Sequence, residues 1–287
     1  MIFIVDSGST KCDWLAIDYQ GNLILDKQHT KGMNPAILSE DELCKRIQSN
    51  SILNKHKDEV THVYFYGAGC GTEKPRLLLK NVLETFFCNA NVDVKEDTYA
   101  AAYACIGTAH DRGLVCILGT GSNCSYFNGA YIEQRVESLG YSIMDDASGN
   151  YFGRQLIRDY YFNYMPENLK IEFENIFNMA SDTIKYNLYK QENPNAYLAS
   201  FAAFMFTHKS SDYIKELIKA GIQLFAKTMI FQYKELLGEM PVHFAGSIAF
   251  MSQDQIKEVA KDMGFRIGNF VQRPIDELVA YHISKFK

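Results

Sequence analysis

Two short turns rich in glycine and hydroxyl side chains, each following an apolar β-prone run, constrain this chain more than any other feature. The first lies in FIVDSGSTKCDW near the N-terminus, and the second lies in LVCILGTGSNCSYF from residue 114. Glycine lets backbone N–H groups approach phosphate oxygens without a Cβ in the way, and the hydroxyls add donors. Either turn alone could be an ordinary hairpin. Two such turns facing each other could grip a triphosphate from both sides, which a single hairpin cannot do.

The chain of 287 residues suits two domains of ordinary size with well-formed cores. Strand and helix patterns alternate, so we expect an α/β protein with one lobe over residues 1–110 and a second over residues 111–287.

Three segments test this pattern in detail. Residues 3–5, 13–17 and 23–25 are apolar and are separated by turn signals, which predicts an antiparallel three-stranded meander. Residues 212–237 carry apolar residues at helical spacing and are followed by Gly238, which predicts one long helix. Residues 274–287 predict the last helix.

Composition excludes several classes of protein. The formal net charge is −5 and no dense Lys/Arg run with interleaved aromatics is present, so we expect no nucleic-acid partner. No apolar run approaches the roughly 18 residues that span a bilayer, and no basic segment opens the chain, so we expect neither membrane insertion nor secretion. The seven cysteines are odd in number and include no C-x-x-C pair, which indicates reduced thiols and a cytoplasmic protein.

Two familiar nucleotide motifs do not fit. The chain has no G-x-x-x-x-G-K-[ST] loop, which argues against a P-loop ATPase. The run from Gly67 to Gly71 lacks the glycine spacing of a dinucleotide fingerprint, and we interpret it as a close-approach loop in the first lobe.

Three segments carry a resemblance to a known superfamily. The D-x-G-x-T pattern at Asp6, the GTGSN string at Gly119 and the segment HFAGSIAF at His243 are similar to the phosphate-1, phosphate-2 and adenosine motifs of the superfamily that contains actin, hexokinase and the sugar kinases. The longer string GTGSNC is similar to N-acetylglucosamine kinases and their relatives in the BadF/BadG/BcrA/BcrD ATPase group.

This resemblance implies two ribonuclease H-like lobes with a nucleotide cleft between them, and a last helix that packs back on the first lobe. Asp6 stands at a strand end, where a carboxylate can hold Mg²⁺ through water. The residues expected to bind ATP are Gly8, Ser9, Thr10, Lys11, Gly119, Thr120, Gly121, Gly246 and Ser247.

The resemblance also implies a catalytic base. In that family an Asp at the start of a helix accepts the proton of the attacking sugar hydroxyl, and KEDTYAAAYA puts Asp97 in that position. A carboxylate suits the task because the loose transition state of phosphoryl transfer needs the hydroxyl oriented and its proton taken late. The alternative is that Asp97 is only a helix N-cap, and Glu96 is the second candidate for the base.

For the sugar, the family pattern carries over to Asn34, Ser122, Asn123 and Asp145. Amide and carboxylate groups can each hold two neighbouring hydroxyls. An Asn in a Pro-bounded turn and an acidic surface cluster are the alternative explanations. The segment around Asp145 departs from the usual G-D-E-G-S pattern of the family, because Met144 and Ala147 replace glycines and Asp146 replaces the Glu.

The leading hypothesis is an ATP- and Mg²⁺-dependent kinase that phosphorylates a hexosamine, with N-acetylglucosamine and its 6-hydroxyl favoured, and that could form a homodimer. A first alternative is an ATPase that activates a radical dehydratase, but such activators need cysteines beyond the second turn and none follows Cys124. A second alternative is a nucleotide- or sugar-binding regulator that has lost catalysis.

Overall fold

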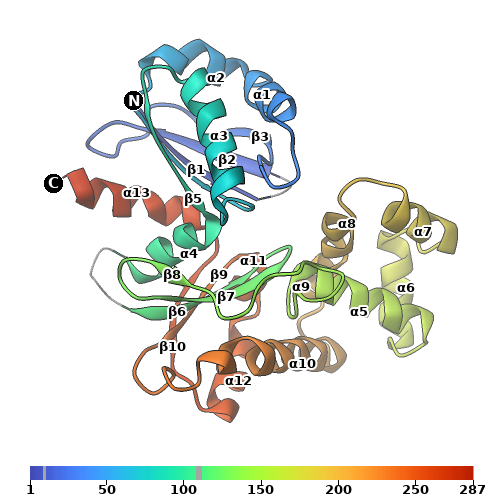
Figure 1. Ribbon diagram of the computed structural model, residues 1–287. Helices are drawn as coiled ribbons and strands as arrows, with labels where there is room; N and C mark the ends of the chain where they lie inside the picture. The colour runs from blue at the N-terminus through green and yellow to red at the C-terminus, as the bar shows by residue number, and fades with distance from the viewer. Residues whose placement is uncertain (9–10, 108–111, 287) are drawn as a thin grey trace. The chain divides into compact units, whose positions relative to one another are not determined.

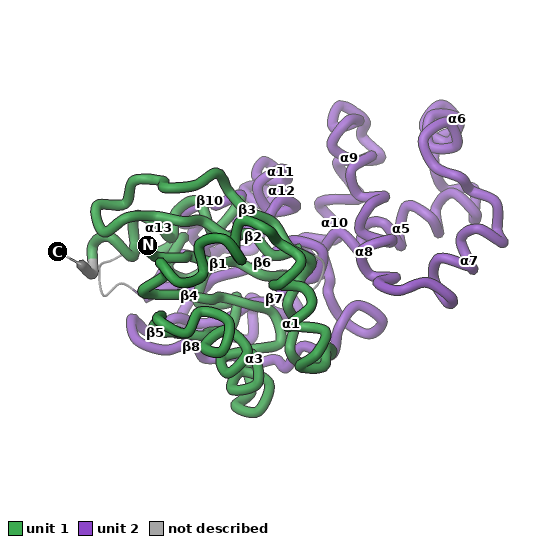
Figure 2. The backbone as a smooth tube through the Cα atoms, turned by 90° about the horizontal axis from the view of Figure 1, so that it is seen from above, with its two compact units in different colours: residues 1–111, 273–287 green, residues 112–272 purple. Residues whose placement is uncertain are grey.

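The computed structural model describes residues 1–8, 11–107 and 112–286. The chain divides into two compact units, shown in different colours in Figure 2: unit 1 is Met1–Asp111 with Arg273–Lys287, and unit 2 is Arg112–Gln272. Each unit contains a five-stranded mixed sheet with helices, so the predicted α/β class is confirmed. Within the described ranges, no helix combines the length and the apolar character needed to cross a membrane.

The sheet of unit 1 has the strand order β3-β2-β1-β4-β5. Its first three strands form an antiparallel meander, and β1, β4 and β5 run parallel. The strands are β1 (Ile2–Ser7), β2 (Lys11–Ile17), β3 (Gln28–Lys31), β4 (His62–Gly67) and β5 (Asn91–Glu96). The helices are α1 (Glu40–Gln48), α2 (Ser51–His56), the 3₁₀ turn η1 (Lys57–Glu59), α3 (Glu73–Phe86), α4 (Asp97–Ile106) and α13 (Pro274–Phe286).

The third strand of the meander is not the segment predicted at residues 23–25. Leu23 makes only an isolated bridge to β2 and is 64% exposed, and the strand forms at Gln28–Lys31 instead. That strand is polar in sequence, yet its Thr30 is buried and accepts a hydrogen bond of 3.1 Å from the Trp14 indole N–H. The prediction was wrong because a buried Trp requires a hydrogen-bond partner, and the side chains of the apolar segment, unlike Thr30, carry no acceptor.

The two faces of this sheet pack against different helices. Alternate residues of β1 point to opposite faces, so that Phe3 and Val5 join Trp14 in a core with α1 and α3. Phe3 and Trp14 meet edge to face at 5.8 Å between ring centroids.

The opposite face contacts α4 and the C-terminal helix α13, although α13 follows the whole of unit 2 in sequence (Figure 1). Tyr281 of α13 stacks on Tyr103 of α4 at 4.0 Å between centroids. The ring of His282 is hydrogen bonded through Nε2 to the Tyr66 hydroxyl of β4 at 2.9 Å. All four side chains are buried, so the last helix completes the core of unit 1.

Unit 2 has a sheet of order β10-β9-β6-β7-β8, in which β6, β7 and β8 are antiparallel neighbours and β6, β9 and β10 run parallel. Its strands are β6 (Gly113–Leu118), β7 (Ser122–Phe127), β8 (Ile132–Glu133), β9 (Val242–Ala245) and β10 (Ile267–Val271). Its helices are α5 (Gly149–Tyr161), α6 (Glu167–Ile176), α7 (Ser181–Tyr189), α8 (Pro194–Phe201), α9 (Ala203–Thr207), α10 (Asp212–Thr228), the 3₁₀ turn η2 (Ile230–Tyr233), α11 (Ser247–Met251) and α12 (Gln253–Met263).

The helix predicted over residues 212–237 ends earlier, at Thr228. The chain then turns so that Tyr233 is fully buried, with its hydroxyl 3.3 Å from the carbonyl oxygen of Cys124 and 3.2 Å from that of Glu133. A buried Tyr hydroxyl needs hydrogen-bond partners, and these long-range contacts outweigh the local helical pattern.

Candidate active site

The first turn joins β1 to β2 in unit 1. The N–H of Gly8 donates to the carbonyl oxygen of Lys11 at 3.0 Å, which closes the turn. A Cβ added to Gly8 would have that same oxygen, at 3.8 Å, as its nearest neighbour, so the backbone is open to close approach there. Two residues expected to bind ATP, Ser9 and Thr10, lie outside the described residues.

Carboxylates gather beside this turn. Asp6 on β1 stands directly opposite Asp13 on β2 in the antiparallel register. Burial raises the pKa of Asp6 to about 6, the negative charges of Asp13 and Asp276 add to the rise, and Lys27 opposes it. A cation bound beside Asp6 would therefore favour the ionised form of its carboxyl group.

Asp13 is held by two basic side chains. Its Oδ1 lies 2.8 Å from the Lys11 ammonium nitrogen and 2.6 Å from Nδ1 of His29 on β3. Burial acts to raise the pKa of Asp13, but the hydrogen bonds from Lys11 and His29 outweigh it and hold the pKa below its ordinary value. The Lys11 side chain remains 58% exposed, so this expected ATP ligand lies at the surface beside the first turn.

Asp97 is the first residue of α4, directly after β5. Burial raises its pKa to about 7; the carboxylates of Glu96 and Asp6 raise it further, and the backbone N–H groups at the helix start oppose the rise. An N-cap carboxylate would stand one position earlier, where the structure has Glu96. The structure thus brings Asp97 and Asp6 into electrostatic contact within unit 1, with Asp97 poised to exchange a proton near neutral pH.

Glu96, the second candidate for the base, faces the loop after β4. A Cβ added to Gly71 would lie 2.8 Å from a Glu96 carboxylate oxygen, and the Thr98 hydroxyl donates to the other oxygen at 3.1 Å. Glu96 therefore supports the glycine-rich loop, in agreement with its interpretation as a close-approach loop.

Asn34, expected to bind the sugar, contacts the same loop. Its Oδ1 accepts the N–H of Ala36 at 2.9 Å, and a Cβ added to Gly69 would lie 2.0 Å from that oxygen. Gly69 also has φ +80°, so this position requires glycine for two reasons. Unit 1 therefore places Asn34 and Glu96 against one loop.

The second turn, Gly119–Gly121, joins β6 to β7 in unit 2. Its carbonyl groups are used internally: Gly149 N–H donates to Gly119 O at 2.7 Å, and Asn150 N–H donates to Thr120 O at 3.1 Å. In the described part of the chain, no hydrogen bond uses the N–H of Thr120 or of Gly121. The turn thus keeps two backbone donors for an anion, as a phosphate cradle requires.

Asp145 lies against this turn and not in an acidic surface cluster. Its Oδ1 accepts the N–H of Ser122 at 3.1 Å, its Oδ2 accepts the Asn150 side-chain amide at 3.0 Å, and a Cβ added to Gly121 would lie 2.9 Å from Oδ2. Asp145 and Ala147 have φ of +66° and +58°, in the left-handed region that favours glycine. The family pattern has glycine at the position of Ala147, so this chain keeps the bend without the glycine.

The predicted adenosine motif lies beside the second turn. Gly246 follows β9 with φ +105°, and a Cβ added there would lie 2.4 Å from the carbonyl oxygen of Leu118, immediately before Gly119. Ser247 begins α11. Unit 2 therefore brings together the expected ATP residues Gly119, Thr120, Gly121, Gly246 and Ser247 with the expected sugar residues Ser122 and Asp145.

Asn123 is the remaining residue expected to bind the sugar. It lies on β7 opposite Ile117, and its buried side-chain oxygen has no hydrogen-bond partner among the described residues. An unpaired buried acceptor costs about 1–3 kcal/mol, which a ligand N–H or O–H group would offset.

A magnesium ion and a nucleotide fit these residues in different ways. Among the described residues, no group of three or more His, Cys, Asp or Glu side chains is placed to hold a metal ion. Mg²⁺ usually keeps several waters and takes one or two carboxylates together with substrate phosphates, so a single carboxylate such as Asp6 suffices. The open backbone donors of the second turn suit phosphate oxygens.

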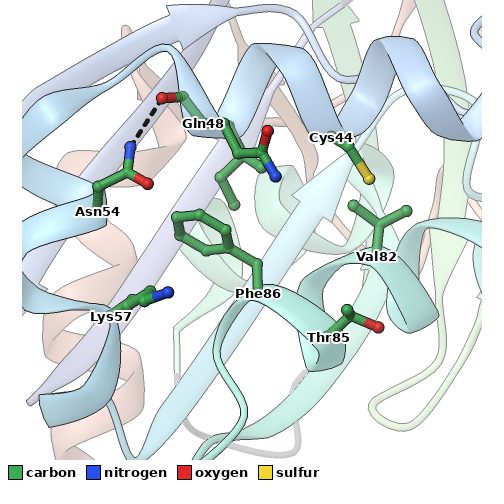
Figure 3. A pocket seen from close by; sticks show the side chains of 8 residues that line it. Cys44, Gln48, Asn54, Lys57, Val82, Thr85 and Phe86 are labelled. Carbon is green, nitrogen blue, oxygen red and sulfur yellow. Dashed lines mark hydrogen bonds between the residues drawn. The ribbon is translucent and has the colours of Figure 1, made fainter.

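A separate hollow lies in unit 1 between α1, α2 and α3 (Figure 3). Ile47, Val82 and Phe86 form its apolar part, and the Lys57 ammonium lies 5.9 Å from the centre of the Phe86 ring. None of the residues expected from the sequence to bind ATP, metal or sugar lines it.

Two groups of residues were missed by sequence reasoning. Asn150 contacts both the second turn and Asp145, and Asp13 with His29 stands beside Asp6. The position of Asp13 and His29 beside Asp6 follows only from the cross-strand register. For Asn150 the sequence offers no signal beyond its place in the first turn of a helix.

The fold defines a class of protein. A structure from Streptomyces griseus of a ROK-family glucokinase in complex with glucose and AMPPNP matches 98% of this chain and 98% of its own, with a TM-score of 0.59 and 16% identity. A provisionally named N-acetylglucosamine kinase from Chromobacterium violaceum matches 98% of each chain with a TM-score of 0.67 and 13% identity. These likenesses show the actin-like ATPase fold that sugar kinases share.

A third structure is similar in sequence as well. A protein from Porphyromonas gingivalis, provisionally named an N-acetylglucosamine kinase, is 32% identical to this chain, covers 100% of both chains and superposes with a TM-score of 0.92. No protein-family model and no curated protein sequence matches the chain. The chain belongs to the N-acetylglucosamine kinase-like family of the actin-like ATPase superfamily.

Proposed function

We propose that this protein is an ATP- and Mg²⁺-dependent sugar kinase whose acceptor is a hexosamine, with N-acetylglucosamine 6-phosphate as the expected product. The observation that carries the proposal is Asp97, a carboxyl group at the start of α4 whose pKa is raised to about 7 by burial and by neighbouring carboxylates. A general base works best when its pKa is near the operating pH.

The other residues have roles that their contacts support. The backbone N–H groups of Thr120 and Gly121 would hold phosphate oxygens, because no hydrogen bond within the described residues uses them. Gly8, Ser9, Thr10 and Lys11 would contact the phosphates from the first turn. Gly246 and Ser247 would pack against the adenosine.

Asp6 would hold Mg²⁺ through water, and the ion would supply charge neutralisation of the transferring phosphoryl group. Asn34, Ser122, Asn123 and Asp145 would hold the sugar, since each presents amide, hydroxyl or carboxylate groups of the kind that sugars require. Asp97 would then orient the attacking hydroxyl and accept its proton.

The comparisons support a sugar kinase, and the identity of the acceptor sugar is our proposal. The full-length likeness to the P. gingivalis protein favours N-acetylglucosamine. A relative from Listeria monocytogenes, with 16% identity, is provisionally named an N-acetylmannosamine kinase, so that amino sugar belongs in any substrate panel.

A coupled assay of ADP release tests the proposal directly. The purified protein would be mixed with ATP, Mg²⁺ and a panel of N-acetylglucosamine, N-acetylmannosamine, glucosamine and glucose. We expect ADP release that depends on an amino sugar and exceeds the rate with glucose. ATP binding without sugar-dependent turnover on any member of the panel would contradict the proposal and would favour a regulator.

The remaining expectations concern surroundings and partners. None of the seven cysteines, all within the described part of the chain, forms a disulfide, which supports a cytoplasmic location. The substrates are small molecules, and we propose neither a nucleic-acid nor a membrane partner. A homodimer stays a proposal, for which the mass of the protein in solution is the test.

A further inference from the structure

Asn150 is the point at which the second turn and the segment of residues 140–148, here called the Asp145 loop, are joined. Its side-chain NH₂ donates to the carbonyl oxygen of Thr120 at 2.7 Å and to Asp145 Oδ2 at 3.0 Å. Its backbone N–H donates to the same Thr120 oxygen at 3.1 Å. A single residue therefore contacts a residue proposed for ATP and a residue proposed for the sugar.

The orientation of the Asn150 amide is fixed by its partners. Both groups that face the NH₂ are acceptors only, a carbonyl and a carboxylate, so turning the amide over would place oxygen against oxygen. The side-chain oxygen is thereby directed away from them, and it has no hydrogen-bond partner among the described residues. Asn150 is 1% exposed, and burying an unpaired amide oxygen costs about 1–3 kcal/mol.

This cost indicates that the two NH₂ bonds serve more than packing. The Asp145 loop also takes on left-handed backbone at two residues other than glycine, Asp145 and Ala147, in the conformation that brings the carboxylate to Ser122 and Asn150. Strained backbone conformations of this kind are found preferentially at functional sites.

We propose that Asn150 is a positioning residue that couples nucleotide binding at the second turn to sugar binding at the Asp145 loop. When phosphates order the N–H groups of the turn, Thr120 holds Asn150, and Asn150 holds the Asp145 carboxylate in place for the sugar hydroxyls. By linkage the sugar must favour the nucleotide by the same factor. This inference rests on the proposed kinase function.

The first experiment measures the coupling by calorimetry. N-acetylglucosamine is titrated into the protein alone and into the protein saturated with Mg²⁺ and a non-hydrolysable ATP analogue, and the reverse pair of titrations closes the cycle. We expect each ligand to tighten the other by roughly 5- to 150-fold in the wild-type chain, the usual range of such coupling. In Asn150→Ala and Asn150→Asp that factor falls toward one.

Asn150→Asp keeps the size of the side chain but removes the donors and sets a second carboxylate against Asp145, whereas Asn150→Ala removes the donors without adding charge. Loss of coupling in both variants therefore assigns it to the hydrogen bonds. Asn187→Ala is the matched control, because Asn187 lies on α7 of the same unit and its amide also donates to a backbone carbonyl, that of Thr183 at 2.8 Å. We expect wild-type coupling in this control. Kinetically, the Asn150 variants raise the KM for both substrates more than they lower kcat.

A second experiment needs no variant, so a variant that fails to fold does not prevent the test. Hydrogen exchange of the wild-type chain is followed with sugar alone and with the nucleotide analogue alone. We expect sugar alone to slow exchange at residues 119–121, and nucleotide alone to slow exchange at residues 145–150.

The outcomes separate the inference from the proposed function. Undiminished coupling in folded Asn150 variants overturns the inference alone, as does sugar binding that leaves exchange at residues 119–121 unchanged. A wild-type chain that binds no sugar overturns both.

Discussion

The two turns that the sequence presents as equivalents differ in what surrounds them. The first turn, in unit 1, stands among ionisable side chains. Asp6, Asp13 and Lys11 lie on the two strands that it joins, and the negative charge of Asp6 raises the pKa of Asp97. The second turn, in unit 2, is held by backbone and amide hydrogen bonds to the start of α5, with one carboxylate.

The two units therefore differ in what they place at their turns: unit 1 places ionisable side chains there, and unit 2 places hydrogen-bonded backbone. Raised pKa values at Asp6 and Asp97 mean that unit 1 keeps carboxyl groups in surroundings that disfavour their ionisation, a typical property of catalytic groups. The second turn of unit 2 has its carbonyl groups hydrogen bonded and keeps two backbone donors for a ligand, a property of an anion-binding element. Changes in unit 1 should therefore affect turnover, and changes in unit 2 should affect stability and binding.

The largest effect is expected for Asp97→Asn, which removes the proton acceptor while keeping the shape. We expect kcat with an amino sugar to fall by about 100- to 10,000-fold, the range for loss of a general base, with the protein still folded and able to bind nucleotide. Steady-state kinetics with circular dichroism as a check on folding gives the answer. Turnover close to that of the wild type would remove Asp97 from the mechanism.

Glu96→Gln is the matched control, because it neutralises the adjacent carboxylate. We expect a much smaller loss, together with a lower pKa for Asp97, since one of the causes of its rise is gone. A greater loss for Glu96→Gln than for Asp97→Asn would exchange the roles of the two residues.

The pH dependence should follow the state of the same group. A base must be deprotonated, and the pKa of Asp97 is raised to about 7, so activity should increase as pH rises through that value. The profile of kcat/KM reports the free enzyme, and we expect a fall of about tenfold per pH unit below the pKa and a plateau above it. A profile that is flat between pH 5 and pH 8 would contradict the assignment.

In unit 2, Gly246→Ala should destabilise the fold. The added Cβ would meet the carbonyl oxygen of Leu118 at 2.4 Å, and φ is +105°. Left-handed strain and overpacking together should lower the free energy of unfolding by about 2–4 kcal/mol, measured by urea titration.

Gly264→Ala is its control, because φ there is +79° and an added Cβ would have no neighbour within 4 Å. Strain alone should cost about 1 kcal/mol. Equal losses in the two variants would show that the contact with Leu118 does not matter, and that the end of β9 is not held against the second turn as tightly as the structure indicates.

The smallest effect is expected for Ala147→Gly, which restores the residue of the family pattern. Relief of the left-handed conformation at φ +58° favours the variant, while the greater freedom of glycine in the unfolded chain and the loss of a buried methyl oppose it. These terms nearly cancel, so we expect a change in the free energy of unfolding within about 1 kcal/mol. A large loss would show that the methyl contact holds the Asp145 loop.

Much of the fold could be predicted from the sequence, because the signals that decided it were local. The strands predicted at residues 3–5 and 13–17 and the helix predicted at residues 274–287 form as β1, β2 and α13, since each has a clear local pattern. The resemblance to sugar kinases likewise rested on short strings, and the comparisons confirm it.

What the sequence could not provide depends on distant partners. The third strand forms at a polar segment because Thr30 meets Trp14, and the helix beginning at Asp212 ends early because Tyr233 finds carbonyl partners on distant segments. Asn150 and the pair Asp13–His29 lacked any local motif. The two wrong elements arose where a buried polar group, the Trp14 indole or the Tyr233 hydroxyl, found its partner outside its own segment.

The C-terminal helix has a consequence for how the protein is made. Because Tyr281 and His282 complete the core of unit 1, that unit remains without one layer until residues 274–286 leave the ribosome, by which time all of unit 2 has been synthesised. The N-terminal sheet must wait with the side chains of Tyr66 and Tyr103 uncovered, so a nascent chain stalled before residue 273 would be a natural client for a chaperone.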